Sequence, residues 1–136
     1  AILLVSFAAK LAALASLPDA QVVYGMIAAH ALARGALPVM SLNLPYARKD
    51  GLAANAGQPD AMVAVVAVAI AIVIAVLALS WGNAFCAVLV TALCAAAMAW
   101  LALRQIGGQT GDVLGGAEQV SETAILVLLA ARLAQP

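Results

Sequence analysis

The run from residue 61 to residue 79 limits what this chain can fold into more than any other feature. It contains no charged or strongly polar residue. A helix of this length, rising ~1.5 Å per residue, nearly matches a hydrocarbon core about 30 Å thick. A transmembrane β-strand would be about ten residues long with a polar inner face, which this run lacks. The run therefore predicts a membrane-spanning helix.

The composition supports a membrane protein. Hydrophobic residues make up 67% of the 136 residues and charged residues 9%, whereas soluble domains are roughly 45–50% apolar and about 25% charged. The formal net charge is zero, so no nucleic-acid partner is expected from the charge balance. Cys86 and Cys94 share one apolar segment, and we interpret them as small core residues. The expected surroundings are the lipid bilayer.

Hydropathy and helix-breaking prolines divide the chain into five apolar segments. They cover residues 1–17, 20–40, 61–79, 84–103 and 113–133, and a turn at 80–83 joins the third to the fourth. The third segment carries a stripe of small residues typical of close helix packing in lipid. That stripe consists of Ala64, Ala67, Ala71, Ala75 and Ala78. We predict an all-α fold, a polytopic membrane bundle of about five transmembrane helices.

Basic residues predict the orientation of this bundle. With five spans, the loops 41–60 and 104–112 lie on one side and contain Arg48, Lys49 and Arg104. The two opposite loops contain no Lys or Arg. The positive-inside tendency places the basic loops in the cytoplasm, although Arg132 near the C-terminus argues weakly for the reverse.

The stretch 107–122, GGQTGDVLGGAEQVSE, combines glycines with acids. On a helix, Gly111, Gly115, Glu118 and Glu122 form one stripe, with Asp112 ~100° away. Such a face suits a hard cation such as Mg²⁺ carrying phosphate groups. The glycines that could bring backbone amides close to a phosphate are Gly107, Gly108 and Gly111. The alternative is a flexible loop in which Thr110 caps the next helix and the acids favour its N-terminus.

Two further groups are candidate binding residues. His30 and Arg34 lie one turn apart on one face of the second segment, where they could hold an anionic substrate or pair with the acids of the last helix. Alternatively, Arg34 reaches the interface and His30 is a neutral packing residue. In the loop segment YARKDGL, Arg48 could bind a phosphate through two hydrogen bonds and Gly51 could permit a tight turn. The expected excess of basic residues in cytoplasmic loops would also explain Arg48 and Lys49 without any binding role.

These motifs together resemble a known family. The segment GGQTGDVLGGAEQVSE, preceded by Arg34 and by PYARKDGLA at 45–53, resembles the C-terminal half of cobalamin synthase, the adenosylcobinamide-GDP ribazoletransferase family. The resemblance covers essentially the whole chain. This chain lacks the second Gly that family members have after Leu52, and it has Gly116 where they have Ala. It implies that residues 1–136 are the C-terminal membrane portion of one membrane-embedded transferase domain.

The resemblance also implies a function. Such an enzyme is a multi-pass protein of the bacterial inner membrane that uses Mg²⁺, joins adenosylcobinamide-GDP to α-ribazole or its 5'-phosphate, and releases GMP. The catalytic and metal-binding carboxylates would be Asp112, Glu118 and Glu122. The phosphate- or substrate-binding residues would be Arg34, Arg48, Gly107, Gly108, Thr110 and Gly111. Whether the protein forms a homo-oligomer is left open.

One family feature has no counterpart here. Family members carry an upstream acidic segment of the type HLDGLADTADG, which would supply the main metal ligands. We therefore expect that part of the active site is absent and that this chain alone is inactive. Two other classes stay open, a transporter or channel subunit and a purely structural membrane subunit.

Overall fold

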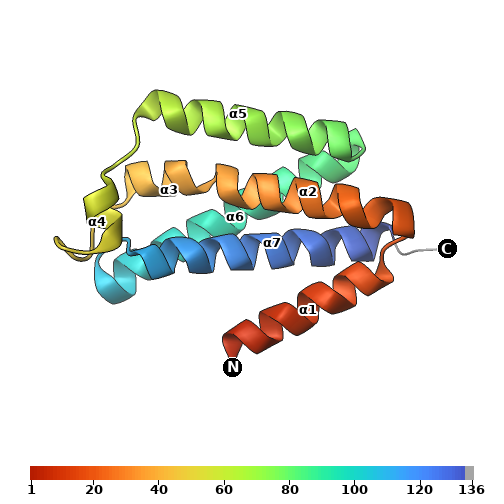
Figure 1. Ribbon diagram of the computed structural model, residues 1–136, viewed down its shortest axis with the longest axis horizontal. Coiled ribbons are helices and arrows are strands. Elements are labelled where there is room, and N and C mark those ends of the chain that lie inside the picture. The colour runs from red at the N-terminus through yellow and green to blue at the C-terminus, as the bar shows by residue number, and fades with distance from the viewer. Residues whose placement is uncertain (134–136) are drawn as a thin grey trace.

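The computed structural model describes residues 1–133, and this part of the chain consists of helices joined by loops (Figure 1). Its helices are α1 (Ile2–Ser16), α2 (Asp19–Gly35), α3 (Leu37–Asn43), α4 (Leu52–Ala56), α5 (Ala61–Ala78), α6 (Trp81–Ile106) and α7 (Gly111–Leu133). Four stretches are long and apolar enough to cross a membrane: α2 with α3, then α5, α6 and α7. The apolar helix α1 is shorter, at 15 residues. These helices confirm the predicted all-α membrane bundle with about five spanning segments.

The helices lie roughly side by side, and their connections gather at two ends (Figure 1). The α1–α2 and α5–α6 turns lie at one end. Helix α4 and the α6–α7 connection lie at the other, which we call the loop end and define as residues 44–60 and 107–110. The sequence-based expectation that the two basic loops share one side is therefore confirmed.

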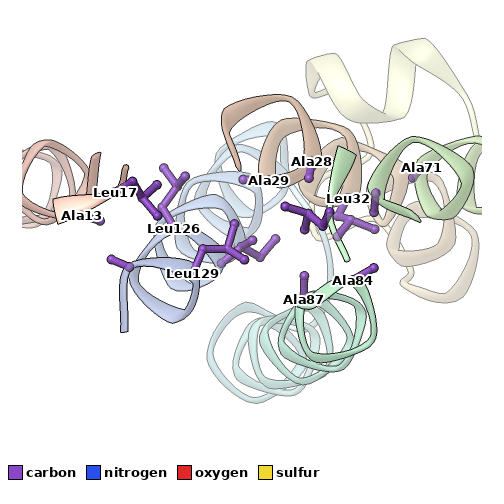
Figure 2. Close-up of a cluster of buried hydrophobic side chains, with 14 residues drawn as sticks. Ala13, Leu17, Ala28, Ala29, Leu32, Ala71, Ala84, Ala87, Leu126 and Leu129 are labelled. Carbon is purple, nitrogen blue, oxygen red and sulfur yellow. The ribbon is translucent and has the colours of Figure 1, made fainter. Parts of the chain in front are cut away.

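The core is built mainly from alanine, with a few leucines from α2 and α7 (Figure 2). Leu32 and Leu129 point into the space between the helices toward alanines of α5 and α6, whereas Leu126 lies beside Leu17 at the end of α1. Small residues let helix backbones approach closely, which is the main source of helix association in lipid. Ala64, Ala71 and Ala75 of the predicted α5 stripe are buried, so that stripe is confirmed as a packing face.

Gly35 shows how close this packing is. A Cβ atom at Gly35 would lie 2.5 Å from the Ala71 Cβ and 3.2 Å from the Ala67 carbonyl oxygen. Any side chain at position 35 would therefore require a shift of α2 or α5. The α2–α5 contact therefore depends on the absence of a side chain at Gly35.

Large apolar side chains lie on the outside of the bundle. Ile70 of α5 is 56% exposed, and Phe85 and Leu93 of α6 are exposed to a similar degree. A soluble protein rarely exposes apolar surface on this scale. Small residues inside and large apolar residues outside are the distribution expected of a protein whose solvent is lipid.

Several helix boundaries differ from the prediction. The second segment is broken near Ala36 into α2 and α3, because Pro38 has no N–H to donate to the preceding turn. The predicted turn at 80–83 is wrong: α6 already begins at Trp81, and the Ala84 N–H donates to the Ser80 carbonyl at 2.8 Å. Hydropathy marks the apolar middle of a helix and misses its polar ends. For the same reason the prediction ended the fourth segment at residue 103, whereas α6 extends to Ile106. The predicted 41–60 loop contains the short helix α4.

Candidate functional site

The two motif-bearing loops are paired at the loop end. The Gln109 N–H donates to the Pro45 carbonyl at 2.7 Å, and the Ala47 N–H donates to the Gln109 carbonyl at 3.0 Å. These bonds form a short parallel β-bridge between Tyr46 and Gln109. The bridge joins the 45–53 and 107–122 motifs, which are far apart in the chain.

Two glycines make this pairing possible. A Cβ atom at Gly108 would clash with the Pro45 carbonyl oxygen and lie 3.1 Å from the Ala47 nitrogen. Gly107 ends α6 with a φ of +77°, a left-handed conformation that favours glycine. Both glycines therefore have a role in shaping the loop, and their contact with a phosphate stays a prediction.

Gln109 fastens the bridge to the end of α3. Its side chain is buried, and its Nε2 donates to the carbonyls of Ser41 at 2.8 Å and Leu44 at 2.7 Å. These are carbonyls at the C-terminal end of α3, where helical partners run out. Sequence reasoning missed Gln109, because a glutamine in a glycine-rich loop looks like any polar loop residue until its burial is known.

A cleft of about 630 Å³ lies beside this bridge. The first loop contributes Arg48 and Gly51 to its lining, and the second contributes Thr110, Gly111 and Asp112. Four of the nine predicted site residues therefore line one cleft. The other five do not line it, and they are Arg34, Gly107, Gly108, Glu118 and Glu122.

The start of α7 forms one wall of the cleft. The Thr110 Oγ1 accepts a hydrogen bond from the Val113 N–H at 3.2 Å, so Thr110 is the helix cap that one interpretation of the sequence proposed. No atom lies near the Cβ position of Gly111, which leaves open space at the helix start. Free N–H groups and the helix dipole at such a position favour a bound anion.

Asp112 has the surroundings of an available oxygen ligand. It is exposed, lines the cleft, and forms no ion pair within residues 1–133. Magnesium is commonly held by one or two carboxylates together with substrate phosphates. Asp112 therefore offers a free oxygen ligand on the cleft, Arg48 on the same cleft offers hydrogen-bond donors to an anion, and magnesium binding stays a prediction.

Glu118 and Glu122 lie deeper in the bundle than Asp112, in contact with α2. The Arg34 Nε donates to the Glu118 Oε1 at 2.8 Å, and the His30 Nδ1 lies 3.9 Å from the Glu122 Oε2. The first contact confirms that Arg34 pairs with an acid of the last helix, and the second places His30 beside Glu122. Ligand atoms of His30, Glu118 and Glu122 all lie within 4.8 Å of one another.

Lys10 of α1 joins this group, and sequence reasoning missed it. Its Nζ lies 3.2 Å from the Glu122 Oε2 and donates to the Gln119 Oε1 at 2.6 Å. The available signal was a single lysine within an apolar segment, since ionisable residues inside a membrane span mark functional sites by default. With Lys10 and Arg34 present, the two carboxylates are balanced by two cations. A metal ion is thus better suited to Asp112, and metal binding by Glu118 and Glu122 stays a prediction.

A second cavity, of about 370 Å³, lies between α2, α3, α5 and α6. Its lining is almost entirely apolar, chiefly alanine and valine, and contains no ionisable side chain. It offers no group for phosphate or metal chemistry, so the candidate site is the cleft at the loop end.

The fold and the cleft define a class: an α-helical, multi-pass membrane protein that joins a basic loop to the acidic start of a spanning helix. Residues 1–130 match the family model described as cobalamin-5-phosphate synthase, and the chain belongs to that family.

The chain is 40% identical over 130 residues to an adenosylcobinamide-GDP ribazoletransferase of Bradyrhizobium diazoefficiens, covering 95% of this chain and 50% of that relative. A second ribazoletransferase, from Chlorobaculum tepidum, is 38% identical over 115 residues, covering 79% of this chain and 44% of the relative. The chain spans about half the length of the curated relatives it matches. No solved structure matches it.

Proposed function

We propose that this chain is part of an adenosylcobinamide-GDP ribazoletransferase, which joins adenosylcobinamide-GDP to α-ribazole or α-ribazole 5'-phosphate and releases GMP. Family membership supports this proposal. The observation that carries it is the Tyr46–Gln109 bridge, because it places Arg48 and Asp112 on one cleft. A cation, a carboxylate and a helix N-terminus on one cleft are the groups that phosphoryl-type transfer needs.

The proposed chemistry is a substitution at phosphorus. A hydroxyl oxygen of the ribazole forms a bond to the phosphorus nearest the cobinamide and loses its proton to water, and the bond from that phosphorus to the oxygen of the leaving GMP breaks. Arg48 and the N–H groups at the start of α7 would hold phosphate oxygens and stabilise the charge that develops on them. Asp112 would hold magnesium, which when bound neutralises charge on the diphosphate. Arg34, Glu118 and Glu122 would contribute from deeper in the bundle.

The proposed location is the bacterial inner membrane, with the loop end in the cytoplasm. Nucleotide substrates are available in the cytoplasm. Arg48 and Lys49 belong to the loop end and Arg104 to the last turn of α6, as the positive-inside tendency requires. The proposed small-molecule partners are adenosylcobinamide-GDP and either α-ribazole or its phosphate.

Release of GMP tests the proposal. In membranes that contain this chain as part of a full-length family member, we expect Asp112→Asn to lower the rate by about 100-fold or more, as removal of a charge-stabilising group does. Removal of Mg²⁺ should abolish the reaction. Asp50→Asn is the matched control, because Asp50 lies in the same loop region, is exposed, and does not line the cleft.

An unchanged rate in Asp112→Asn would contradict the assignment of the cleft. Loss of substrate flux without loss of product formation would instead support a transporter, and no effect of either Asp112→Asn or Glu122→Gln would support a structural subunit. We also propose that the 136-residue chain alone does not release GMP, and catalysis by the purified chain would refute this.

A further inference from the structure

A group of ionisable residues lies halfway along three helices. Within the span Asp19–Asn43, His30 is 11 residues from the first residue and 13 from the last. Glu122 is 11 residues from each end of α7, and Lys10 lies near the middle of α1. Together with Arg34 and Glu118 these residues form what we call the polar belt, defined as Lys10, His30, Arg34, Glu118 and Glu122.

Part of the polar belt is exposed. The side chains of His30 and Arg34 are 54% and 63% exposed, while those of the other members are 15–16% exposed. Arg34 bonds to Glu118 through its Nε alone, so its other N–H groups have no partner within residues 1–133. Hydrocarbon cannot accept hydrogen bonds from these groups.

Helix α5 has a different surface near its middle. Ile70 lies near the middle of α5 and is 56% exposed, almost the same fraction as His30. An exposed isoleucine at mid-span suits lipid, whereas ionised side chains at this depth face protein or a water-filled space. The two faces therefore need different surroundings.

We propose that the polar belt faces water, as the wall of an aqueous path that runs from the loop end to the middle of the membrane over α2 and α7. Gly115 lies on this route between the start of α7 and Glu118, and the space at its Cβ position is open. The charges favour water over protein as the occupant, because Lys10 and Arg34 already balance Glu118 and Glu122 and leave no excess charge for a partner to neutralise. This rests on the proposed function, to which Arg34, Glu118 and Glu122 contribute, and extends the site toward the middle of the membrane, since Glu118 lies ~9 Å along α7 from Asp112.

Cysteine accessibility tests this directly. In full-length protein in cell membranes, with Cys86 and Cys94 replaced by alanine, single cysteines are placed by His30→Cys and by Ile70→Cys as the matched control. A negatively charged thiosulfonate that does not cross lipid is applied to both membrane faces. Because only the thiolate reacts, we expect modification at position 30 to be at least about tenfold faster than at position 70. Both cysteines should react after denaturation in detergent, which shows that each is present.

A third variant, Gly115→Cys, keeps the test informative if His30→Cys fails to fold, because the structure has room for its side chain. We expect it to react as fast as position 30 or faster, since it lies nearer the loop end. Equal and slow modification at positions 115 and 70, or at positions 30 and 70, would overturn the proposal. That result would mean that lipid or another protein segment covers the polar belt.

Discussion

At the scale of single residues, Gly108 shows how a missing side chain determines the site. The bridge between Tyr46 and Gln109 forms only because the backbone of Gly108 can lie against Pro45. Any Cβ atom there would push the two loops apart and separate Arg48 from Asp112. The glycine pattern predicted an approach of backbone amides to a phosphate, which stays a prediction, and the structure shows that Gly108 is also needed for contact between two loops.

Gly108→Ala should therefore destabilise the protein. Overpacking of a close contact typically costs about 1–3 kcal/mol, and we expect a corresponding fall in the Tm of the protein in detergent. The matched control is Gly115→Ala, because a Cβ atom at Gly115 meets no other atom within 4 Å. It should be neutral or slightly stabilising, as Gly to Ala changes within helices often are. Equal Tm values for the two variants would contradict the role assigned to Gly108.

At the scale of helices, the bundle depends on close contacts between small residues. The contact of Gly35 in α2 with Ala67 and Ala71 in α5 is the closest example. Helices in lipid gain little from burying apolar surface, because lipid is equally apolar, so packing of this kind decides which faces meet.

Gly35→Val tests this contact. The branched side chain would overlap Ala71, and we expect a loss of about 1–3 kcal/mol of stability, measured as a lower Tm or faster proteolysis. Ala71→Gly in the same chain should restore part of the loss, because it removes the nearest overlapping atom. Gly25→Ala is the control, since a Cβ atom there meets its neighbours at 3.5 Å, an ordinary contact. Failure of Ala71→Gly to restore any stability would argue against direct overlap.

At the scale of the whole molecule, polar groups lie at different depths along the helix bundle. The cleft with Arg48 and Asp112 lies at the loop end, and the polar belt lies at mid-span. At the far end of the bundle, the Arg132 Nε donates to the Asn83 Oδ1 at 2.6 Å, which holds α7 to α6. A single chain thus has polar groups at three depths of a largely apolar bundle.

The orientation of the bundle makes a further prediction. Asp50→Cys at the loop end should react with an impermeant thiol reagent applied to the cytoplasmic face of intact membranes, and Ser80→Cys only from the opposite face. Both replacements belong in the background lacking Cys86 and Cys94. The reverse pattern would place Arg48 and the cleft away from cytoplasmic nucleotides and would contradict the proposed location.

The membrane class, the helices and the family follow from sequence alone, because they depend on local properties. The apolar run at 61–79 is long enough to span a bilayer whatever it packs against, and the glycine and acid motif is continuous in the chain. Tertiary structure alone decided which motif residues meet. Asp112 and Glu118 are six residues apart on one helix, yet Asp112 lines the cleft with Arg48 while Glu118 pairs with Arg34. The positions of Lys10 and Gln109 likewise depend on contacts between distant segments, which no local pattern of hydropathy or spacing contains.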